Sequence, residues 1–227
     1  MGEVVAGFPN SRRVICFVGI DGSGKTTQAM KTLSYMRNRK NKCSYVWFGE
    51  PYLFSYPFMV ACRILGFTRS IILQNGSDFI EHQYYRNKVI AFLWPWVQLI
   101  DLIILVNLRV VLPVSFGFTV VCDRFVHDAL VGVMADTKEG NLPKRLVGRL
   151  ILRIVPRGSA VFLLDTDVRV AYRRRLDVPN LAYLTVRRKY YRFIAECSGV
   201  SLIDVNGPFF GSLKQRIDLR PTSLVFL

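Results

Sequence analysis

A glycine-rich octet at residues 19–26 has the residue types and the spacing that hold a phosphate chain. It reads G-x-x-x-x-G-K-T, with its two fixed glycines at Gly19 and Gly24. Glycines allow backbone N–H groups to point inward around phosphate oxygens. Lys25 would reach the β- and γ-phosphates, and the Thr26 hydroxyl would coordinate Mg²⁺. The octet therefore predicts a site for a nucleoside triphosphate and Mg²⁺.

The residues on both sides of the octet supply the elements that must position it. An apolar, β-branched run at 14–18 precedes the glycines, and a helix-forming run at 27–33 follows them. A phosphate loop lies between a strand and a helix in this way, and the helix N-terminus adds partial positive charge. A chance lysine in an ordinary glycine-rich turn is the alternative, which this context disfavours. The residues expected to surround the phosphates are Gly19, Asp21, Gly22, Ser23, Gly24, Lys25, Thr26 and Thr27.

Asp123 and Arg124 form a second candidate element, directly after the apolar run at 118–122. A carboxylate at the carboxyl end of a parallel strand lies beside the phosphate loop in sheets of this kind. From there Asp123 would order the Mg²⁺ shell or accept a proton, whereas the planar fork of Arg124 would hold phosphate oxygens. The alternative is an exposed Asp-Arg pair at the end of a strand.

Strand-like and helix-like runs alternate along the chain, which predicts an α/β fold with a parallel sheet. Most of the strand-like runs are continuously apolar, as strands covered on both faces must be. The five expected strands are 14–18, 44–48, 118–122, 160–164 and 200–203. The expected helices lie near 25–38, 79–110, 142–155, 168–176, 181–197 and 210–218. We therefore expect a three-layer fold in which helices flank a five-stranded parallel sheet, in a single domain over residues 1–227.

The run at 89–114 is nearly all apolar and is long enough to span a bilayer. Four polar or charged residues within it would be costly in lipid: Gln98, Asp101, Asn107 and Arg109. A helix that is apolar on most sides also occurs at the centre of α/β domains. We therefore expect the run at 89–114, within an apolar helical segment 79–114, to be a buried helix rather than to cross a membrane, with Pro95 kinking or starting the helix. Contact with a membrane surface remains an alternative because the chain is basic.

The composition indicates the cellular compartment of the protein and the charge of its partners. The 227 residues carry a net charge of +15, which suits anionic partners such as nucleotides, nucleic acid or an anionic membrane. The five cysteines form no C-x-x-C pair and the two histidines give no metal-ligand spacing, so we expect free thiols in a reducing cytoplasm. The N-terminal residues lack the charged and apolar regions of a signal peptide. These features predict a cytoplasmic protein.

These motifs resemble thymidylate kinases and their relatives among the P-loop nucleoside monophosphate kinases. Residues 17–28 are similar to the family's phosphate loop, including Asp21, and residues 123–125 match its Asp-Arg-Tyr element. Glu50-Pro51 resembles the family's Glu-Pro turn, and a later strand leads into an arginine-rich stretch that resembles its lid. The likeness runs in order from about residue 13 to about residue 219.

The resemblance implies a P-loop kinase fold and a homodimer that uses ATP and Mg²⁺ to phosphorylate dTMP to dTDP, with no nucleic-acid partner. The implied catalytic residues are Lys25, Asp123, Arg124 and, on a lid near 166–180, Arg173, Arg174 and Arg175, for which a solvated basic helix face is the alternative. The implied acceptor-binding residues are Asp21, Glu50, Arg124 and Arg86, which would contact the thymine base. The implied metal ligands are Thr26, Asp21 and Asp123. Residues 126–132 depart from the family pattern, so we expect dUMP to compete better than in a typical thymidylate kinase.

Other functions fit the same loop. One is a nucleotide-dependent switch or peripheral membrane ATPase, and another is a kinase for a different small phosphate acceptor. A guanine-type switch needs an Asn-Lys-x-Asp base reader, and neither Asn-Lys pair, at 41 and 87, supplies the aspartate. We interpret the basic stretches at 145–153 and 187–189 as solvated helix faces, with a membrane or nucleic-acid footprint as the less favoured alternative.

Overall fold

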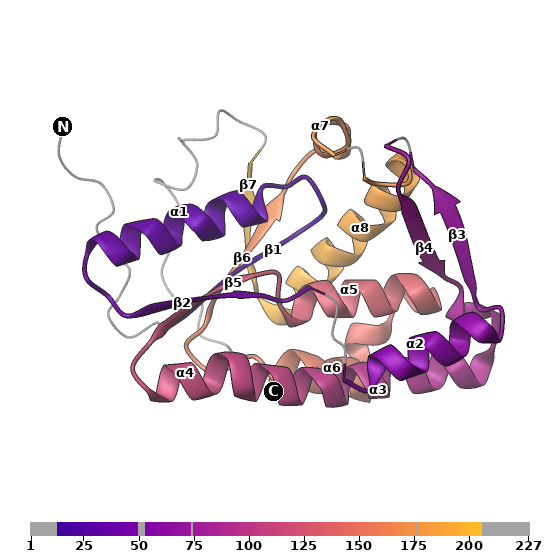
Figure 1. Ribbon diagram of the computed structural model, residues 1–227, viewed down its shortest axis with the longest axis horizontal. Coiled ribbons are helices and arrows are strands. Elements are labelled where there is room, and N and C mark those ends of the chain that lie inside the picture. Colours follow the sequence, from indigo (N-terminus) through magenta and orange to yellow (C-terminus); the bar gives the residue numbers. More distant parts are fainter. Residues whose placement is uncertain (1–12, 50–52, 74, 176, 206–227) are drawn as a thin grey trace.

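Strand β1 (Val14–Val18) lies at the centre of a five-stranded parallel sheet in the computed structural model, which describes residues 13–49, 53–73, 75–175 and 177–205 (Figure 1). The strand order is β2-β5-β1-β6-β7. The other strands are β2 (Cys43–Trp47), β5 (Thr119–Asp123), β6 (Ala160–Asp165) and β7 (Ser201–Asp204). Neighbouring strands pair in parallel, so their carboxyl ends meet at one edge of the sheet.

Strand β1 is buried on both faces because its side chains alternate between two cores. Ile15 and Phe17 belong to the core beneath α1 (Lys25–Asn38). Cys16 and Val18 belong to the core on the opposite face. A strand that contributes to two cores needs apolar residues at every position, which is why this run is continuously apolar rather than alternating.

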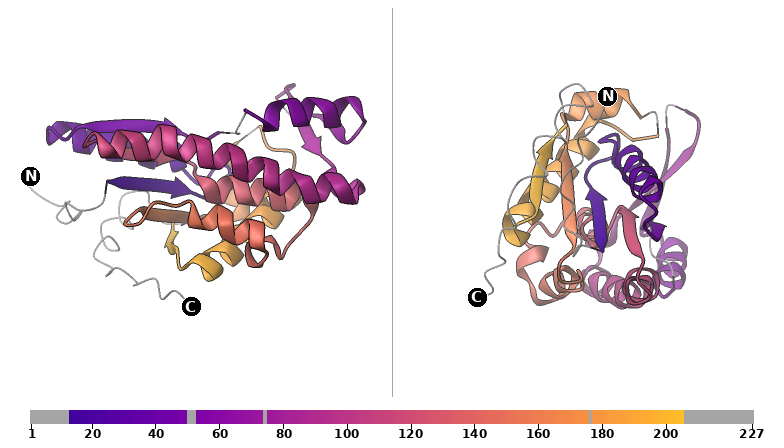
Figure 2. Two further views of the ribbon diagram at one scale, coloured as in Figure 1. Left: turned by 90° about the horizontal axis from the view of Figure 1, so that it is seen from below. Right: turned by 90° about the vertical axis from the view of Figure 1, so that its left-hand side faces the viewer.

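Helices cover both faces of the sheet, as Figures 1 and 2 show. Helix α1 packs on one face, and the other face is covered by α3 (Lys88–Val106), α5 (Val126–Thr137), α6 (Leu146–Arg153) and α8 (Leu181–Ser198). The shorter helical elements are α2 (Ser55–Ile64), α4 (Leu112–Ser115), α7 (Val168–Arg173), the 3₁₀ turns η1 (Tyr84–Arg86) and η3 (Leu142–Lys144), and the π-helical turn η2 (Asn107–Val111). This arrangement confirms the expected α/β class, with a five-stranded parallel sheet flanked by helices.

The strand predictions are confirmed to within one residue at each end, but the prediction of a helix that starts at residue 79 is wrong. Residues Asp78–His82 form β4, which pairs antiparallel with β3 (Thr68–Ile72). An Asn75-Gly76 turn, with Gly76 at φ 80°, precedes β4, and this dipeptide is a known hairpin signal. Helices α2 and α5 were also not predicted, and the expected helix at 210–218 lies outside the described residues.

Helix α3 continues through η2 and α4, and its two sides have different surroundings. Trp94 and Leu102 are buried in the core, whereas Phe92 and Ile103 on the other side are 63% and 44% exposed. The expected burial of this segment therefore holds for one side only. Among the described residues this is the one helix whose length and composition would allow a membrane span, and a little under half of its most apolar stretch is buried. Pro95 lies inside α3, not at its start.

Asp101 shows how the apolar helix α3 accommodates a carboxylate. Its oxygens accept hydrogen bonds from the backbone N–H groups of Phe54 and Ser55, at 2.8 and 2.9 Å. These donors lie at the start of α2, where backbone N–H groups have no partner within the helix. Asp101 therefore caps α2 and attaches it to α3.

Candidate functional site

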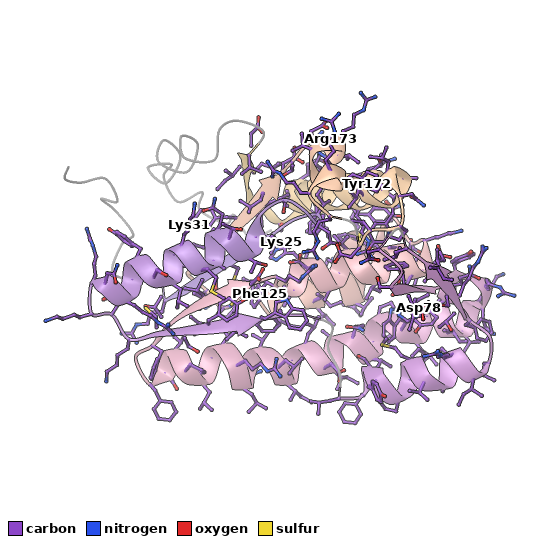
Figure 3. All side chains as sticks on the ribbon, turned by 45° about the horizontal axis from the view of Figure 1, so that its top comes forward. Lys25, Lys31, Asp78, Phe125, Tyr172 and Arg173 are labelled. Carbon is purple, nitrogen blue, oxygen red and sulfur yellow. The ribbon has the colours of Figure 1, made fainter. Side chains whose placement is uncertain are left out.

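The glycine-rich loop at residues 19–24 joins β1 to α1 at the carboxyl edge of the sheet. Gly22 and Gly24 have φ angles of 83° and 90°, a left-handed conformation that residues with a Cβ rarely adopt. A Cβ at Gly22 would also collide with the backbone of Ala171 in α7. Figure 3 shows Lys25 at this end of α1 and Arg173 on α7. The loop is thus held close to α7 and ends on the N-terminus of α1, whose free N–H groups favour an anion.

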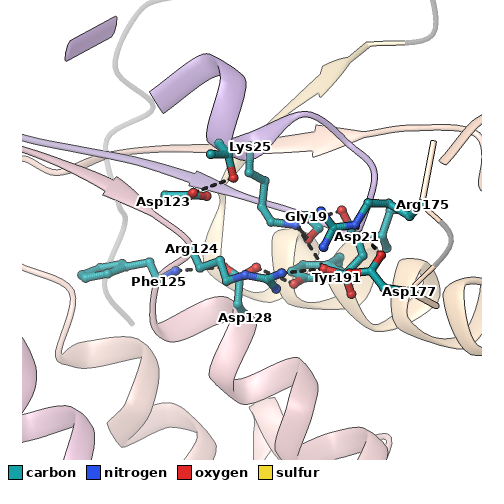
Figure 4. A network of polar contacts seen from close by, with 12 residues as sticks. Gly19, Asp21, Lys25, Asp123, Arg124, Phe125, Asp128, Arg175, Asp177 and Tyr191 are labelled. Carbon is teal, nitrogen blue, oxygen red and sulfur yellow. Dashed lines mark hydrogen bonds and ion pairs between the residues drawn. The ribbon is translucent and has the colours of Figure 1, made fainter. Parts of the chain in front are cut away.

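Lys25 and Thr26 begin α1 and make specific contacts around the loop. Figure 4 shows the Lys25 side chain beside Gly19 and Asp21. The Lys25 ammonium donates hydrogen bonds to the carbonyl oxygens of Gly19 and Ile20, at 2.5 and 2.8 Å. The Thr26 hydroxyl donates to Asp123 Oδ2 at 2.6 Å. Because β1 and β5 are neighbouring parallel strands, the structure brings Thr26 and Asp123 together as the sequence suggested.

One carboxylate oxygen of Asp123 has no hydrogen-bond partner among the described residues. Oδ2 also accepts a hydrogen bond from the Tyr45 hydroxyl at 3.0 Å, whereas the buried Oδ1 has no hydrogen-bond partner among the described residues. Mg²⁺ is commonly held by one or two protein oxygens, with phosphates and water completing its shell. Thr26 and Asp123 fit that donor set, although the described part of the chain has no group of three or more metal-binding side chains.

The ammonium of Lys25 is buried without a full counter-charge. Its pKa is lowered to about 8, chiefly by burial and next by the charge of Arg124, while Asp21 acts in the opposite direction. The Asp21 carboxylate lies 3.9 Å from the ammonium, so it compensates the charge only in part. A buried cation in this state gains from a nearby anion, and the glycine-rich loop therefore favours phosphate binding.

Asp21 and Arg124 form an ion pair that links the glycine-rich loop to the end of β5, with 2.6 Å between Oδ1 and Nη2. Burial raises the pKa of Asp21, but Lys25, Arg124 and Arg187 together lower it more, so the pKa lies well below its ordinary range. Arg124 has a φ angle of 67°, which is uncommon for a residue with a Cβ and costs free energy. Asp21, predicted as a metal ligand, is therefore bound to an arginine.

A cavity of about 470 Å³ lies beside this ion pair. Asp21 and Arg124 form part of its lining, and helices α3, α5 and α8 with strand β4 supply most of the remaining wall. Its polar lining includes Gln98 from α3, Asp128 and Asp136 from α5, and Arg187 from α8. Its apolar lining includes Phe48, Met59, Trp94 and Val133. A cavity of this size with a few polar groups is suited to a small organic ligand.

The three arginines predicted for a lid follow one another at the end of α7, next to the glycine-rich loop. Arg174 Nη1 donates a hydrogen bond to the carbonyl oxygen of Gly22 at 3.4 Å. Arg175 pairs with Asp177 at 2.8 Å, and Arg173 is exposed. The structure therefore places Arg174 in contact with the loop that would hold the phosphates.

Arg86, the predicted base reader, does not line the cavity. It is exposed on η1, and its Nη1 donates to the carbonyl oxygen of Gly66 at 3.2 Å. Gln98 lines the cavity from the helix that follows, and its buried Oε1 has no partner among the described residues. The spacing of four residues between Trp94 and Gln98 was a signal that both lie on one face of the helix. Glu50, also predicted to bind the acceptor, lies outside the described residues.

The basic stretch at 187–189 is not the solvated face that the sequence suggested. Arg188 donates to both carboxylate oxygens of Asp165, at 2.7 and 2.9 Å, and so ties α8 to the end of β6. Arg187 lines the cavity, with its guanidinium carbon 4.4 Å from the centre of the Tyr183 ring. In the other basic stretch Arg145, Arg149 and Arg153 are exposed, as a solvated face requires.

Comparisons with known proteins assign no function to this chain, so the geometry of the site is the basis for a proposal. No family model matches this chain. No curated protein matches it either.

Proposed function

We propose that this protein is a P-loop nucleoside monophosphate kinase that uses ATP and Mg²⁺ to convert dTMP to dTDP. One observation carries the proposal: the cavity lies beside the glycine-rich loop, and the Asp21–Arg124 ion pair is common to both. The phosphate of a nucleotide in the cavity would therefore lie next to the phosphates of a second nucleotide bound on the loop. Phosphoryl transfer depends on this kind of positioning more than on covalent chemistry.

The phosphates of ATP would lie on the glycine-rich loop. Backbone N–H groups of the loop and of the first turn of α1 would donate to phosphate oxygens. Lys25 would exchange its present carbonyl partners, Gly19 and Ile20, for the β- and γ-phosphates. Thr26 and Asp123 would hold Mg²⁺, whose charge neutralises the phosphates during transfer.

The monophosphate would lie in the cavity with its phosphate at Arg124. One of its oxygens would attack the γ-phosphorus of ATP. A new P–O bond would form as the bond from the γ-phosphorus to the bridging oxygen breaks, and ADP would leave with the electron pair of that bond. Arg124 would hold the acceptor phosphate in line and reduce the repulsion between the two anions. The arginines at 173–175 would close over the transferring group and exclude water.

The alternative function is a nucleotide-dependent switch or peripheral membrane ATPase. Such a protein would bind ATP on the same loop, but it would have no use for a nucleotide-sized cavity beside that loop. ADP formation in the presence of ATP and Mg²⁺, measured with and without added monophosphate, separates the two functions. We expect rapid ADP formation only with the monophosphate, whereas equal rates without it would favour the alternative.

Gln98→Leu should lower kcat/KM for dTMP by about 10- to 100-fold, because the base would lose a buried hydrogen-bond partner. An amide offers one acceptor and a donor group, which together match the N3–H and O4 groups of thymine, and leucine keeps a similar volume. Arg86→Ala is the matched control and should change kcat/KM by less than about two-fold, because Arg86 is a surface residue outside the cavity. A larger loss in Arg86→Ala than in Gln98→Leu, measured by steady-state kinetics, would restore Arg86 as the base reader.

We expect the exposed side of α3 to form a homodimer interface. Val89, Phe92, Ile100 and Ile103 lie on this side and are between 44% and 65% exposed, and an exposed apolar patch of this kind marks an interaction surface. Light scattering should give about twice the chain mass of 26.0 kDa, and a Phe92→Glu, Ile103→Glu double variant should be monomeric. Leu146→Glu, at an exposed apolar residue of α6, is the control. A monomeric wild-type protein that sediments with lipid vesicles would instead support membrane contact.

A further inference from the structure

Arg187 is a cation in the cavity wall that no described carboxylate binds within ion-pair distance. It is half-buried on α8, and its guanidinium stacks on the ring of Tyr183. Its Nε is buried without a hydrogen-bond partner, and it forms no ion pair with a carboxylate among the described residues. Arg124 and Arg188 differ in this respect, since each of them binds a carboxylate.

A partly buried guanidinium costs free energy of folding unless an anion, a hydrogen-bond acceptor or an aromatic ring compensates its charge. It cannot lose its proton, and burial removes water from a charged group. The Tyr183 ring offsets part of this cost through a cation–π contact. Tyr183 does not supply a negative charge, because burial raises the pKa of its phenol to about 12.

Arg187 lines the same cavity as the Asp21–Arg124 ion pair. Asp21, Arg124 and Arg187 all line the cavity, and the charge of Arg187 is one of the three that lower the pKa of Asp21. Arg124 shares its charge with Asp21 across 2.6 Å, so these two residues are together close to neutral. Asp21 and Asp136 act on Arg187 through their charges from beyond ion-pair distance, so Arg187 enters the cavity wall as a guanidinium that no described carboxylate binds directly.

We propose that Arg187 binds the phosphate of a phosphate monoester in the cavity, beside Arg124. The inference rests on the proposed function, in which this monoester is the acceptor nucleotide. A planar guanidinium can bind two phosphate oxygens side by side, and the donors of Arg187 are available for such a contact. In the transfer step Arg187 would hold oxygens that do not attack, and it would reduce the repulsion between the acceptor and ATP.

Calorimetry with dTMP and with thymidine, in the absence of ATP, tests this assignment. Thymidine has the same base and sugar but no phosphate, so the ratio of the two dissociation constants isolates the phosphate contact. Arg187→Gln should weaken dTMP binding by about 10- to 100-fold, the effect of losing a charge-assisted contact, and should change thymidine binding by less than about two-fold. Arg187→Lys should recover part of the loss because it restores the charge but not the planar fork.

Arg188→Gln is the matched control on the same helix. Arg188 binds Asp165, so this variant should keep the wild-type ratio of the two dissociation constants. Cooperative thermal unfolding of each variant checks that it is folded. An equal loss of dTMP and thymidine binding in Arg187→Gln would show that Arg187 only packs the wall, and a wild-type protein that binds dTMP no more tightly than thymidine would also overturn the assignment.

The binding assay separates this inference from the proposed kinase activity, because it requires no phosphoryl transfer. A protein that shows the expected ratios but transfers no phosphoryl group would refute the kinase and keep the phosphate contact of Arg187. A protein that transfers the group but keeps the wild-type ratio in Arg187→Gln would refute the contact alone.

Discussion

Lys25→Ala should reduce phosphoryl transfer by about 10³-fold while the protein remains folded. With ATP bound, this ammonium would face the β- and γ-phosphates, where loss of one preorganised donor costs about 10²- to 10³-fold in rate. In this structure it contacts two carbonyl oxygens of the loop, and burial is the main cause that lowers its pKa to about 8. Burial disfavours this charge, but Lys25 also lowers the pKa of Asp21, so its removal should cost some stability while thermal unfolding remains cooperative.

Steady-state ADP formation and calorimetric ATP binding together measure this effect. Lys31→Ala is the control, because Lys31 lies on the same helix but is exposed (Figure 3). It should retain wild-type activity and ATP affinity. If Lys25→Ala bound ATP as tightly as the wild-type protein and turned it over at the same rate, the glycine-rich loop would not be the triphosphate site.

Arg124→Ala should lower kcat/KM for dTMP by about 10²-fold or more and change KM for ATP by less than about three-fold. The proposed partner of Arg124 is the acceptor phosphate, which lies on the cavity side of the glycine-rich loop. The same substitution removes the ion-pair partner of Asp21, whose nearest remaining cation would be Lys25 at 3.9 Å. We therefore expect the pKa of Asp21 to rise and the protein to lose some stability, because a partly buried carboxylate would lose its pair.

An Asp21→Asn, Arg124→Ala double variant separates the two consequences. It removes the unpaired carboxylate, so it should be more stable than Arg124→Ala. Two residues in contact give non-additive changes in the free energy of unfolding, which a double-mutant cycle measures. It should not recover kcat/KM for dTMP, because the guanidinium is still absent. Kinetics in which only KM for ATP rose, in either variant, would show that Arg124 serves the donor nucleotide.

The site residues that directly follow the glycines or end a strand could be predicted from the sequence. Lys25 and Thr26 come directly after the glycines, and Asp123 ends a strand whose apolar run marks it as buried. Since parallel strands end at the same edge of a sheet, the contact between Thr26 and Asp123 follows from these positions. The sheet itself was predicted for the same reason, because strands with two buried faces have a distinctive composition.

The cavity wall could not be predicted, because it depends on which side of each helix faces inward after packing. Arg187 and Arg188 are adjacent in sequence and point about 100° apart around α8. Packing of α8 against α5 places Arg187 in the wall and leaves Arg188 beside Asp165. Arg86 precedes the apolar helix as the resemblance required, yet its contact with Gly66 holds it on the surface.

The apolar composition of residues 89–114 was not enough to predict which sides of this helix are buried. In the sequence Asp101 is a charged residue that opposes membrane insertion, but its structural role as the cap of α2 depends on a helix that the sequence did not reveal. Apolar residues all around α3 predicted burial on every side, but one side is exposed. An apolar side chain is compatible with a core or with an interface, and the sequence does not distinguish them.

Transfer of label from γ-labelled ATP to a nucleoside monophosphate tests the proposed kinase activity most directly. The protein would be incubated with Mg²⁺, labelled ATP and, separately, dTMP, dUMP, dCMP, AMP or GMP under one condition, and the labelled products would be separated. We expect label in dTDP first, a lower yield from dUMP, and the lowest yields from the two purine nucleotides. Label that appears only as inorganic phosphate, or that passes preferentially to AMP or GMP, would contradict the assignment of this protein as a kinase for dTMP.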